Sequence, residues 1–375
     1  MAASARSAGQ STPNPSRHSS SANPAEPLAT SQFDYSLPGE LIAQVPRRRG
    51  YARLLVIERG TGKIHHAAFH DLPHYLDAGD TMVLNNSRVA ARRVKAVAAN
   101  GVTRDALLLR RIGETQWSCL LPGSRSLRRG TALRLLENGA EGSHTVDAVV
   151  SDVLDAGERV LQFHAKTDAA LLERWGTAPL PPYIARALPR AQEERYQTVY
   201  GTLSGSAAAP TAGLHLTRAM LAKLHAMGVG TAFITLHVDI DTFRPVRSAV
   251  ASDHVMHGER IVVTARAAQR INETPGRVVA VGTTSVRALE SAAADCRAAS
   301  ARNITACETT TRLFITPGYQ FRCVDALITN FHLPKSTLLM LVCAFGGFDL
   351  VMHAYHEAVR ERYRFFSFGD AMLIL

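Results

Sequence analysis

The sequence has few cysteines, and those present follow no pattern. They are Cys119, Cys296, Cys307, Cys323 and Cys343, and no pair has the two-residue separation of common zinc and redox motifs. An odd number of scattered cysteines argues against a disulfide framework and against a zinc site. We therefore expect a protein of a reducing, cytoplasmic compartment that holds no metal.

Long apolar runs are also absent. The longest, residues 336–345, is too short to span a bilayer, and the N-terminus lacks the apolar core of a signal peptide. Residues 1–31 are rich in Ser, Ala and Pro, and they resemble a transit peptide only in having a single acidic residue, Glu26. A segment of this composition cannot bury a core, so we predict a disordered tail and no membrane association.

Acidic residues are outnumbered by basic ones. The chain of 375 residues has 32 Asp+Glu against 42 Lys+Arg, a formal net charge of +10. This excess favours a polyanionic partner, with nucleic acid ahead of an acidic membrane surface. Because the charge is spread along the chain, a merely basic enzyme is the alternative. The length predicts about two domains.

A dinucleotide-binding glycine loop is missing as well. Gly60-Thr61-Gly62 follows a strand expected at residues 53–57, but no third glycine comes after it. Residues 63–66 have the pattern of a returning strand. We interpret the two glycines as a hairpin turn.

Residues 89–165 predict a small antiparallel β-barrel. Short alternating stretches at 106–109, 117–121, 132–136 and 160–163 are separated by turn signals such as Asn100-Gly101. Arg125, Arg128 and Arg129 cluster beside one turn. They would contact phosphates if the barrel binds nucleic acid, and a solvated basic loop is the alternative.

Residues 32–88 and 166–375 predict a discontinuous α/β domain with a mostly parallel sheet. Strands expected at 80–84, 233–238 and 278–281 alternate with helices at 217–227 and 286–294. A polar loop precedes an apolar helix that Ser336 caps and Gly346 ends, and a helix at 355–363 and a final strand follow. The predicted fold class is α/β, a main α/β domain with an inserted small antiparallel β-barrel.

Residues 205–217 form the most informative stretch of the chain. Small residues surround Pro210 there, and His215 stands just before Thr217, which is placed to cap a helix. With so little side-chain bulk, backbone amides can approach a polar or anionic ligand closely. The alternative is an alanine-rich loop that serves tight packing.

A set of ordered motifs resembles the S-adenosylmethionine:tRNA ribosyltransferase-isomerases of the queuosine pathway. The resemblance covers residues 33–375, and although each motif is weak alone, the ordered set is specific. The motifs are Phe33-Asp34-Tyr35, Leu37-Pro38, Glu40-Leu41-Ile42-Ala43, Gly79-Asp80, Asn85, Arg88, Pro179-Leu180-Pro181-Pro182-Tyr183-Ile184, Tyr196-Gln197-Thr198-Val199-Tyr200, residues 205–217, Thr235-Leu236-His237-Val238, Thr242-Phe243-Arg244-Pro245-Val246, His254, Met256-His257, Glu259, Gly282-Thr283-Thr284-Ser285-Val286-Arg287, residues 329–337, Tyr363-Arg364-Phe365-Phe366-Ser367 and Gly369-Asp370-Ala371-Met372.

The resemblance implies an activity that the residue pattern alone does not give. Members of this family move the ribosyl part of S-adenosylmethionine (SAM) onto 7-aminomethyl-7-deazaguanine at the tRNA wobble position and rearrange it, giving epoxyqueuosine with release of adenine and methionine. Expected partners are therefore SAM, as co-substrate, and tRNA carrying the precursor base. No further cofactor and no metal are expected, and we expect a monomer.

This chemistry requires at least one base and one acid. The carbon beside a sulfonium is acidic, and adenine leaves more easily when it is protonated. The candidate catalytic residues are His215, His237 and His332, with roles left open between them, and a structural imidazole is the alternative for each. Candidate substrate-binding residues are Tyr196, Gln197, Thr198, Gly205, Ser206, Pro210, Thr211, Thr242, Arg244, His254, His257, Glu259, Thr283, Thr284, Arg287, Asn330 and Lys335.

Three local patterns have competing interpretations. His254, His257 and Glu259 have a spacing that would also suit a metal, but we assign them to substrate contact or to structure. Arg287 and Glu290 lie one helical turn apart and are expected to pair on a helix surface. Asp239-Ile240-Asp241 stands where the family commonly has glycines, which we interpret as a variant turn.

Two other classes of function stay open. A SAM-dependent methyltransferase would need a glycine-rich loop after the first strand of its parallel sheet, and no such loop is convincing. A non-catalytic RNA-binding protein built on the basic barrel would not need residues 205–217. The products formed from SAM distinguish all three classes.

Overall fold

The computed structural model describes residues 28–123, 126–137, 145–154, 157–164, 175–181, 183–184, 190–238, 246, 248–293 and 303–375. Arg125, Asp239, Asp241, Thr242 and Arg244, which the sequence singles out, lie outside the described residues. Residues 28–31, assigned above to the tail, contact the body of the protein. The Thr30 N–H donates to the Ala249 carbonyl, and the Thr30 side chain is buried.

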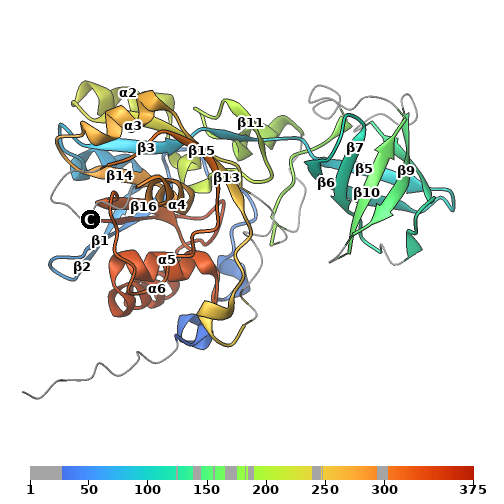
Figure 1. Ribbon diagram of the computed structural model, residues 1–375. Helices are drawn as coiled ribbons and strands as arrows, with labels where there is room; N and C mark the ends of the chain where they lie inside the picture. Colours follow the sequence, from blue (N-terminus) through green and yellow to red (C-terminus); the bar gives the residue numbers. More distant parts are fainter. Residues whose placement is uncertain are drawn as a thin grey trace, which may run out of the picture.

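A nine-stranded sheet forms the centre of the larger part (Figure 1). Its strands lie in the spatial order β15-β13-β12-β3-β14-β16-β17-β1-β2. They are β1 (Arg53–Glu58), β2 (Lys63–Ala68), β3 (Thr81–Asn85), β12 (Gly230–Leu236), β13 (Glu259–Val263), β14 (Val278–Val281), β15 (Cys307–Thr311), β16 (Ala326–Asn330) and β17 (Ala371–Ile374).

The sheet is mixed, which corrects the expectation of a mostly parallel one. The pairs β12–β3, β3–β14, β14–β16 and β17–β1 are parallel. The pairs β1–β2, β12–β13, β13–β15 and β16–β17 are antiparallel. Short connections explain part of the difference, since the turn at Gly60-Thr61-Gly62 leaves room only for the antiparallel hairpin that the sequence predicts.

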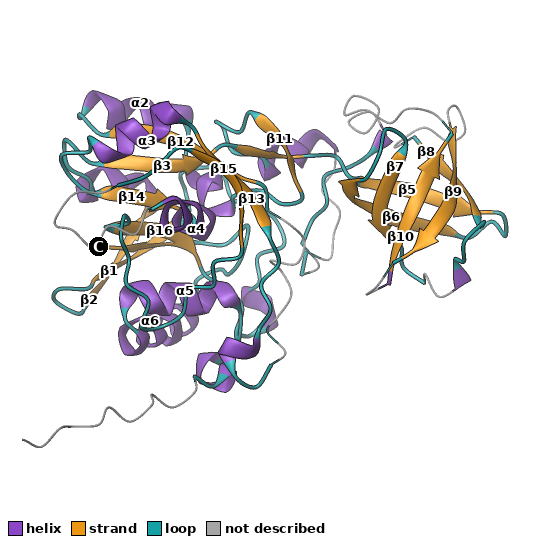
Figure 2. Cartoon of the chain, in the orientation of Figure 1, coloured by secondary structure: helices purple, strands orange, loops and turns teal. Residues whose placement is uncertain are grey.

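Helices cover both faces of this sheet (Figure 2). Alternate residues of β1 show why, because Leu55 and Ile57 join one core and Leu54 and Val56 join the other. The first core contains residues of α3 (Ala265–Asn272), α4 (Thr283–Ala292), α5 (Thr337–Gly346) and α6 (Phe348–Arg360), and the second contains residues of α2 (Arg218–Ala226).

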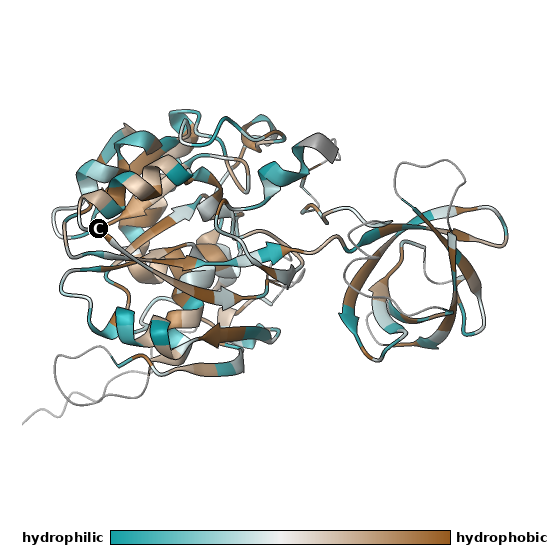
Figure 3. Ribbon diagram, turned by 90° about the horizontal axis from the view of Figure 1, so that it is seen from above, coloured by the Kyte–Doolittle hydropathy of each residue, from teal (hydrophilic) through white to brown (hydrophobic). Residues whose placement is uncertain are grey.

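Short 3₁₀ turns complete this part. They are η1 (Thr30–Phe33), η2 (Gly39–Leu41), η3 (Phe69–Tyr75), η6 (Arg190–Tyr196), η7 (Thr211–His215) and η9 (Ala251–Asp253). In Figure 3 the apolar residues concentrate in the strands and the polar residues in the outer helices and turns.

Helix ends follow local chemistry where the sequence offers a cap. The Thr217 and Ser336 side chains accept from the backbone N–H groups of Met220 and Leu339, as expected. Two starts differ from expectation. α4 begins at Thr283 because Gly282, at φ +91°, turns the chain directly out of β14. α6 begins at Phe348 because Gly347 separates it from α5.

Six strands close into an antiparallel barrel that stands beside the α/β part (Figure 1). They are β5 (Arg93–Ala98), β6 (Thr103–Arg111), β7 (Gln116–Leu120), β8 (Ala132–Leu136), β9 (Thr145–Val153) and β10 (Glu158–Phe163). β5 escaped the sequence pattern because its inward residues include Ala96 and Ala98, whose small side chains give a weak alternation. Arg128 and Arg129 are exposed on the barrel.

The two parts meet at β4 (Ser87–Val89) and β11 (Leu203–Ser206), which pair in parallel. Arg92 follows β4 and crosses this junction. Its guanidinium donates to the Leu109 carbonyl of the barrel and, over 2.6 Å, to the Gly205 carbonyl of the loop that the sequence singles out. The barrel is thereby joined directly to residues 205–217.

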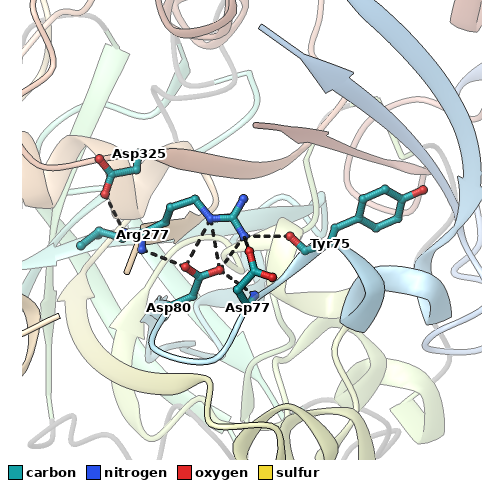
Figure 4. A network of polar contacts seen from close by, with 6 residues as sticks. Tyr75, Asp77, Asp80, Arg277 and Asp325 are labelled. Atoms are coloured by element: carbon teal, nitrogen blue, oxygen red, sulfur yellow. Dashed lines mark hydrogen bonds and ion pairs between the residues drawn. The ribbon is translucent and has the colours of Figure 1, made fainter. Parts of the chain in front are cut away.

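A charged network fixes the amino ends of β3 and β14 (Figure 4). Arg277 donates through Nη2 to the buried carboxylate of Asp80 over 2.7 Å and to Asp77 over 2.9 Å. The Asp325 carboxylate accepts from the Val278 N–H. Although burial opposes it, hydrogen bonds from Arg277 and from backbone amides lower the pKa of Asp80. This network holds the edge of the sheet opposite to the pocket described below.

Among the described residues, no single helix is long and apolar enough to cross a membrane; only α5 and α6 taken together, with a 117° bend between them, meet those criteria.

Candidate active site

The candidate site lies where four parallel strands end. β12, β3, β14 and β16 run in one direction, so their carboxyl ends meet at one edge of the sheet, the usual position for a ligand in α/β folds. An open pocket of about 680 Å³, solvent at its mouth included, lies at this edge. Its lining is Tyr183, Ala209, Pro210, Thr211, Ala212, Val238, Gly282, Thr283, Thr284, Thr329, Asn330, Phe331, His332, Leu333, Ser336, Leu338, Phe366 and Ser367.

Small residues and hydroxyls form one side of the pocket. Pro210 and Thr211 come from the small-residue loop, and Thr283 and Thr284 come from the first turn of α4. The free amides of that turn carry the positive end of the helix dipole, which suits a polar or anionic ligand group. Asn85, at the end of β3, donates to Thr284 Oγ1 and to the Leu236 carbonyl, which fixes the ends of neighbouring strands.

Asn330 lines the pocket and joins it to His215. It ends β16 and is almost fully buried, and its Nδ2 donates to the Phe366 carbonyl over 2.9 Å. Its side chain also interacts with the His215 ring and raises the pKa of that histidine. The amide therefore holds both the Phe366 backbone and the His215 ring in place.

Aromatic side chains form the opposite wall. The ring centroids of Tyr183 and Phe366 lie 4.7 Å apart, and the Tyr183 hydroxyl is 2.6 Å from Ser367 Oγ. Phe366 has a φ of +69°, a backbone conformation that a bulky residue rarely adopts. Backbone strain of this kind concentrates at functional sites.

Of the three candidate catalytic histidines, His332 lines the pocket. Its Nε2 lies 2.9 Å from Thr329 Oγ1, and its backbone N–H donates to the Tyr355 hydroxyl. Burial lowers the pKa of His332 to about 3, so its imidazole is neutral at pH 7. A neutral ring can accept a hydrogen bond or a proton, but a pKa this low makes it a weaker base than a free imidazole.

His215 does not line the pocket, although its position in the loop suggested that it would. Its buried ring packs on Phe69, with centroids 4.9 Å apart. Burial lowers the pKa of His215 to about 4, against the opposing effects of Asp370 and Asn330. The 3₁₀ turn η7 directs this side chain into the protein, where it adjoins Asn330 rather than the ligand space.

His237 is half-buried at the end of β12 and also lies outside the pocket lining. Burial first, and then Arg260 and Arg92, lower its pKa. Its ring lies flat against Gly205, where an added Cβ would come within 3.0 Å of the His237 Cε1 atom. Gly205 has a φ of +143°, so both its backbone conformation and its lack of a side chain are required there.

Four predicted binding residues are not part of the pocket lining. Gln197 exchanges hydrogen bonds with the backbone of Val89 through both amide atoms, and Ser206 Oγ accepts from the Val238 N–H. Tyr196 is fully buried with its ring edge-on to Phe368, and Thr198 is buried too. These residues support the pocket walls from behind.

Glu259, on β13, and Arg287, on α4, form a buried ion pair. The Arg287 guanidinium donates to the Glu259 carboxylate, and its Nε donates to the Leu313 carbonyl. The expected surface pair of Arg287 and Glu290 does not form, because both are buried and face different partners. Glu290 accepts from the N–H groups of residues 322, 323 and 324, and burial raises its pKa.

The remaining candidates lie at other places. The His254 ring is 5.7 Å from the Phe314 ring, edge to face, and burial and the nearby His257 lower its pKa. Lys335 forms an ion pair with Asp34 over 2.6 Å and is not itself part of the pocket lining. No group of three or more metal-ligating side chains is found within the described part of the chain.

Comparison with known proteins decides the family. The sequence profile described as queuosine biosynthesis protein matches residues 30–374. This chain belongs to the queuosine biosynthesis protein family. Among its relatives are proteins named S-adenosylmethionine:tRNA ribosyltransferase-isomerase from Symbiobacterium thermophilum, 49% identical, and Halothermothrix orenii, 45% identical; each alignment covers 93% of this chain and 100% of the relative.

A solved structure supports the same conclusion for the fold. The crystal structure of S-adenosylmethionine tRNA ribosyltransferase from Thermotoga maritima is 38% identical, with a TM-score of 0.50, and covers 92% of this chain and 100% of its own. The fold class, an α/β part with a small antiparallel barrel, is confirmed.

Twelve residues of the pocket lining were not among the predicted site residues, Tyr183, Phe366 and Ser367 among them. Tyr183, Phe366 and Ser367 all stand in quoted motifs, so the signal was present. The predicted site residues are mostly polar or titratable, and this choice passed over the rings of Tyr183 and Phe366. The contact of Tyr183 with Phe366 spans more than 180 positions of sequence, which no local pattern reveals.

Proposed function

We propose that the protein transfers and isomerises the ribosyl group of SAM onto 7-aminomethyl-7-deazaguanine at the tRNA wobble position. The product is epoxyqueuosine-tRNA, and adenine and methionine are released. The names of relatives aligned over their whole length support this activity. The observation that carries it to this chain is the pocket at the carboxyl edge, which six of the family-like motifs line together.

The pocket offers the groups that such a reaction needs. The aromatic wall of Tyr183 and Phe366 suits the face of a purine ring. The first turn of α4 provides hydroxyls and amides for polar groups of SAM. We therefore place SAM in this pocket.

We assign the base side of the chemistry to His332. The proton removed is the one on the ribose carbon beside the sulfonium. The electron pair left there forms a C4′–C5′ double bond as the C4′–O4′ bond breaks, and O4′ then forms a carbonyl with C1′ as the C1′–N bond breaks and adenine leaves with a proton. The amine of the modified base attacks C1′, and methionine leaves later as a thioether when the C5′–S bond breaks as the ring system closes. The neutral ring of His332, oriented by Thr329, is placed to accept the proton from the carbon beside the sulfonium. His215 and His237 stay candidates with no role assigned. With a pKa of about 4 the His215 ring is neutral at pH 7 and has no proton to supply as an acid.

We further propose that the protein acts as a monomer in the cytoplasm, with SAM as its co-substrate and no other cofactor. The cysteine pattern supports a reducing compartment, and Cys119, Cys307, Cys323 and Cys343 form no disulfide. We also propose that residues 32–88 and 166–375 form one domain and residues 89–165 another.

Product analysis tests the activity. The protein is incubated with SAM and tRNA carrying the precursor base, and the small molecules formed are separated by chromatography. Adenine and methionine in equal amounts, both dependent on tRNA, are expected. S-adenosylhomocysteine would indicate a methyltransferase instead, and unchanged SAM would indicate an RNA-binding protein without this activity.

A further inference from the structure

Five arginines gather between the N-terminal loop and the pocket. They are Arg47, Arg48, Arg49, Arg195 and Arg364, and we refer to them as the arginine cluster. Three of the guanidinium groups donate hydrogen bonds to backbone carbonyls of the neighbouring chain segments. The Arg49 Nη2 donates to the Gln197 carbonyl over 2.6 Å, the Arg195 Nη2 donates to the Arg47 carbonyl over 2.6 Å, and Arg364 donates to the Val45 carbonyl.

The positive charge of the cluster is poorly compensated. Carbonyl oxygens orient guanidinium groups but do not neutralise them. Asp370 lies 3.8 Å from Arg47, but it is fully buried and accepts from the backbone N–H groups of Arg53 and Arg364. Glu194, a further carboxylate beside the cluster, forms an ion pair with Arg88.

The arginines also repel each other. Burial and then Arg195 lower the pKa of Arg49, and burial and then Arg47 lower the pKa of Arg364. Like charges held close together cost free energy, and a bound polyanion would relieve that cost. The cluster therefore has the electrostatics of a preformed anion site.

The cluster borders the pocket. Gln44, just before it in the chain, donates to the Tyr183 carbonyl over 2.9 Å, and Tyr183 lines the pocket. Arg364 lies two residues before Phe366, which forms the other half of the aromatic wall. A polymer whose modified base enters the pocket would therefore pass over these arginines.

An exposed aromatic ring adds a second feature. Tyr51 is 57% exposed, and the Arg48 guanidinium stacks over its ring with Cζ 4.7 Å from the centroid. Aromatic rings and arginine planes are the groups on which unpaired bases of single-stranded RNA stack. An acidic membrane surface would also attract this charge, but the nucleotide pocket proposed beside the cluster favours RNA.

We propose that the arginine cluster binds the sugar–phosphate backbone of the tRNA beside the nucleotide that enters the pocket. This inference rests on the proposed function, because that function supplies the tRNA. It assigns the main phosphate contacts to the α/β part rather than to Arg128 and Arg129 of the barrel. Arginine suits this role because its planar donors match phosphate oxygens.

The double variant Arg47→Gln/Arg48→Gln tests the proposal. Both side chains are exposed, and Asp370, which Arg47 approaches, keeps its hydrogen bonds from the backbone N–H groups of Arg53 and Arg364. Affinity for the substrate tRNA is measured by filter binding from 50 to 200 mM salt. Each lost phosphate contact removes about one unit from the slope of log K against log salt, so we expect a slope smaller by about two and binding weaker by roughly 10-fold. The KM for SAM and the melting temperature should hold.

Two control variants remove the same charge elsewhere. Arg266→Gln/Arg270→Gln changes exposed residues on α3, where Arg270 adjoins Gly230 at the amino end of β12. Arg128→Gln/Arg129→Gln changes the barrel. The α3 variant should leave the slope of log K against log salt unchanged. The barrel variant should reduce that slope less than the cluster variant does.

The outcomes separate this inference from the proposed function. If wild-type protein forms adenine and methionine but the cluster variant keeps the wild-type salt slope, the tRNA surface lies elsewhere and only this inference is wrong. An equal loss of salt slope in the α3 control would overturn it too, since the effect would then come from net charge in general.

Vesicles containing phosphatidylserine are tested in parallel. Vesicle binding that disappears in the cluster variant, with tRNA affinity unchanged, would assign the arginines to a membrane. Absence of adenine release by wild-type protein would instead contradict the proposed function.

Discussion

At the scale of single residues, neighbours in space decide what each histidine does. His215 and His332 both stand in polar, motif-bearing loops, and burial lowers the pKa of both. Only His332 lines the pocket, because its loop continues directly from β16, whereas the ring of His215 stacks on Phe69. The same residue type in similar sequence surroundings therefore has different prospects in catalysis.

We expect His332→Ala to lower turnover by about 100-fold or more, because general-base assistance contributes factors of about 100 to 10,000. The measurement is the rate of adenine release with saturating SAM and tRNA, together with a melting curve. His215→Ala is the comparison variant. Its ring fills space beside Phe69, so we expect its melting temperature to fall and the folded fraction to keep more activity than His332→Ala. Full activity in His332→Ala would remove it from the mechanism.

At the scale of elements, α4 connects the pocket to the rest of the fold. Its first turn lines the pocket, and its second half carries Arg287 and Glu290, which anchor β13 and the loop at residues 322–324. The buried charges thereby hold the helix in register with the sheet. Movement of α4 would displace Thr283 and Thr284 from the ligand space.

We expect Glu259→Gln to destabilise the protein by about 3 kcal/mol or more, because it leaves the buried Arg287 guanidinium without its counter-charge. Urea unfolding measures the change. The double variant Glu259→Gln/Arg287→Met removes both charges and should recover a large part of the loss. A single variant as stable as wild type would show that water or another group already compensates Arg287.

The end of α6 offers a site for stabilisation. Arg362 has a φ of +54°, and the N–H groups of Arg362 and Tyr363 donate to the carbonyls of Val359 and Ala358, as in a Schellman cap. Glycine adopts this conformation without steric cost, so Arg362→Gly should stabilise the protein by about 1 kcal/mol. Thermal unfolding is the readout. Arg362→Ala keeps the Cβ and should give no such gain; an equal gain would mean that removal of the charge, and not the backbone, is responsible.

At the scale of the whole molecule, charge and burial are divided between regions. The apolar residues fill two cores on either side of the large sheet and a third inside the barrel. The net charge of +10 lies outside these cores, and part of it gathers in the arginine cluster beside the pocket. Stability and tRNA binding should therefore respond differently to pH and to salt.

We expect the protein to lose stability as the pH falls from about 6.5 to 4. In the unfolded chain His215 and His332 bind a proton near pH 6.5, but in the folded protein they stay neutral until about pH 4 and 3. The unfolded state thus binds more protons in this range, so unfolding becomes easier by up to about 1.4 kcal/mol per pH unit for each ring. Urea unfolding at pH 7 and at pH 5 measures this change in the free energy of unfolding.

The variants His215→Gln and His332→Gln should each flatten this pH dependence. Lys63→Gln, on the exposed strand β2, removes no group that titrates between pH 4 and 7 and is the control. A pH dependence that is the same in all three variants as in wild type would assign the acid sensitivity to carboxylates such as Asp80, whose lowered pKa acts in the same direction.

The sequence by itself determined the features that depend on near neighbours. Alternation of apolar and polar residues predicted most of the barrel strands. Hydroxyl side chains predicted the helix caps at Thr217 and Ser336, and glycines predicted the turn at Gly60-Thr61-Gly62. All of these effects act over a few residues. The ordered motifs indicated the family, which the profile over residues 30–374 confirmed. The domain borders at 31, 88 and 165 stay predictions, although contacts of Thr30 already lie within the assigned tail.

Only the tertiary structure decided which of the motif residues meet. The aromatic wall joins Tyr183 to Phe366, the buried pair joins Glu259 to Arg287, and the arginine cluster joins residues 47–49 to Arg195 and Arg364. These contacts bring together positions from 28 to more than 300 residues apart, and they depend on strand order and on the packing of helices against the sheet. Spacing along the chain carries no information on either, so the side chains that face the pocket could be recognised only once the sheet had been assembled.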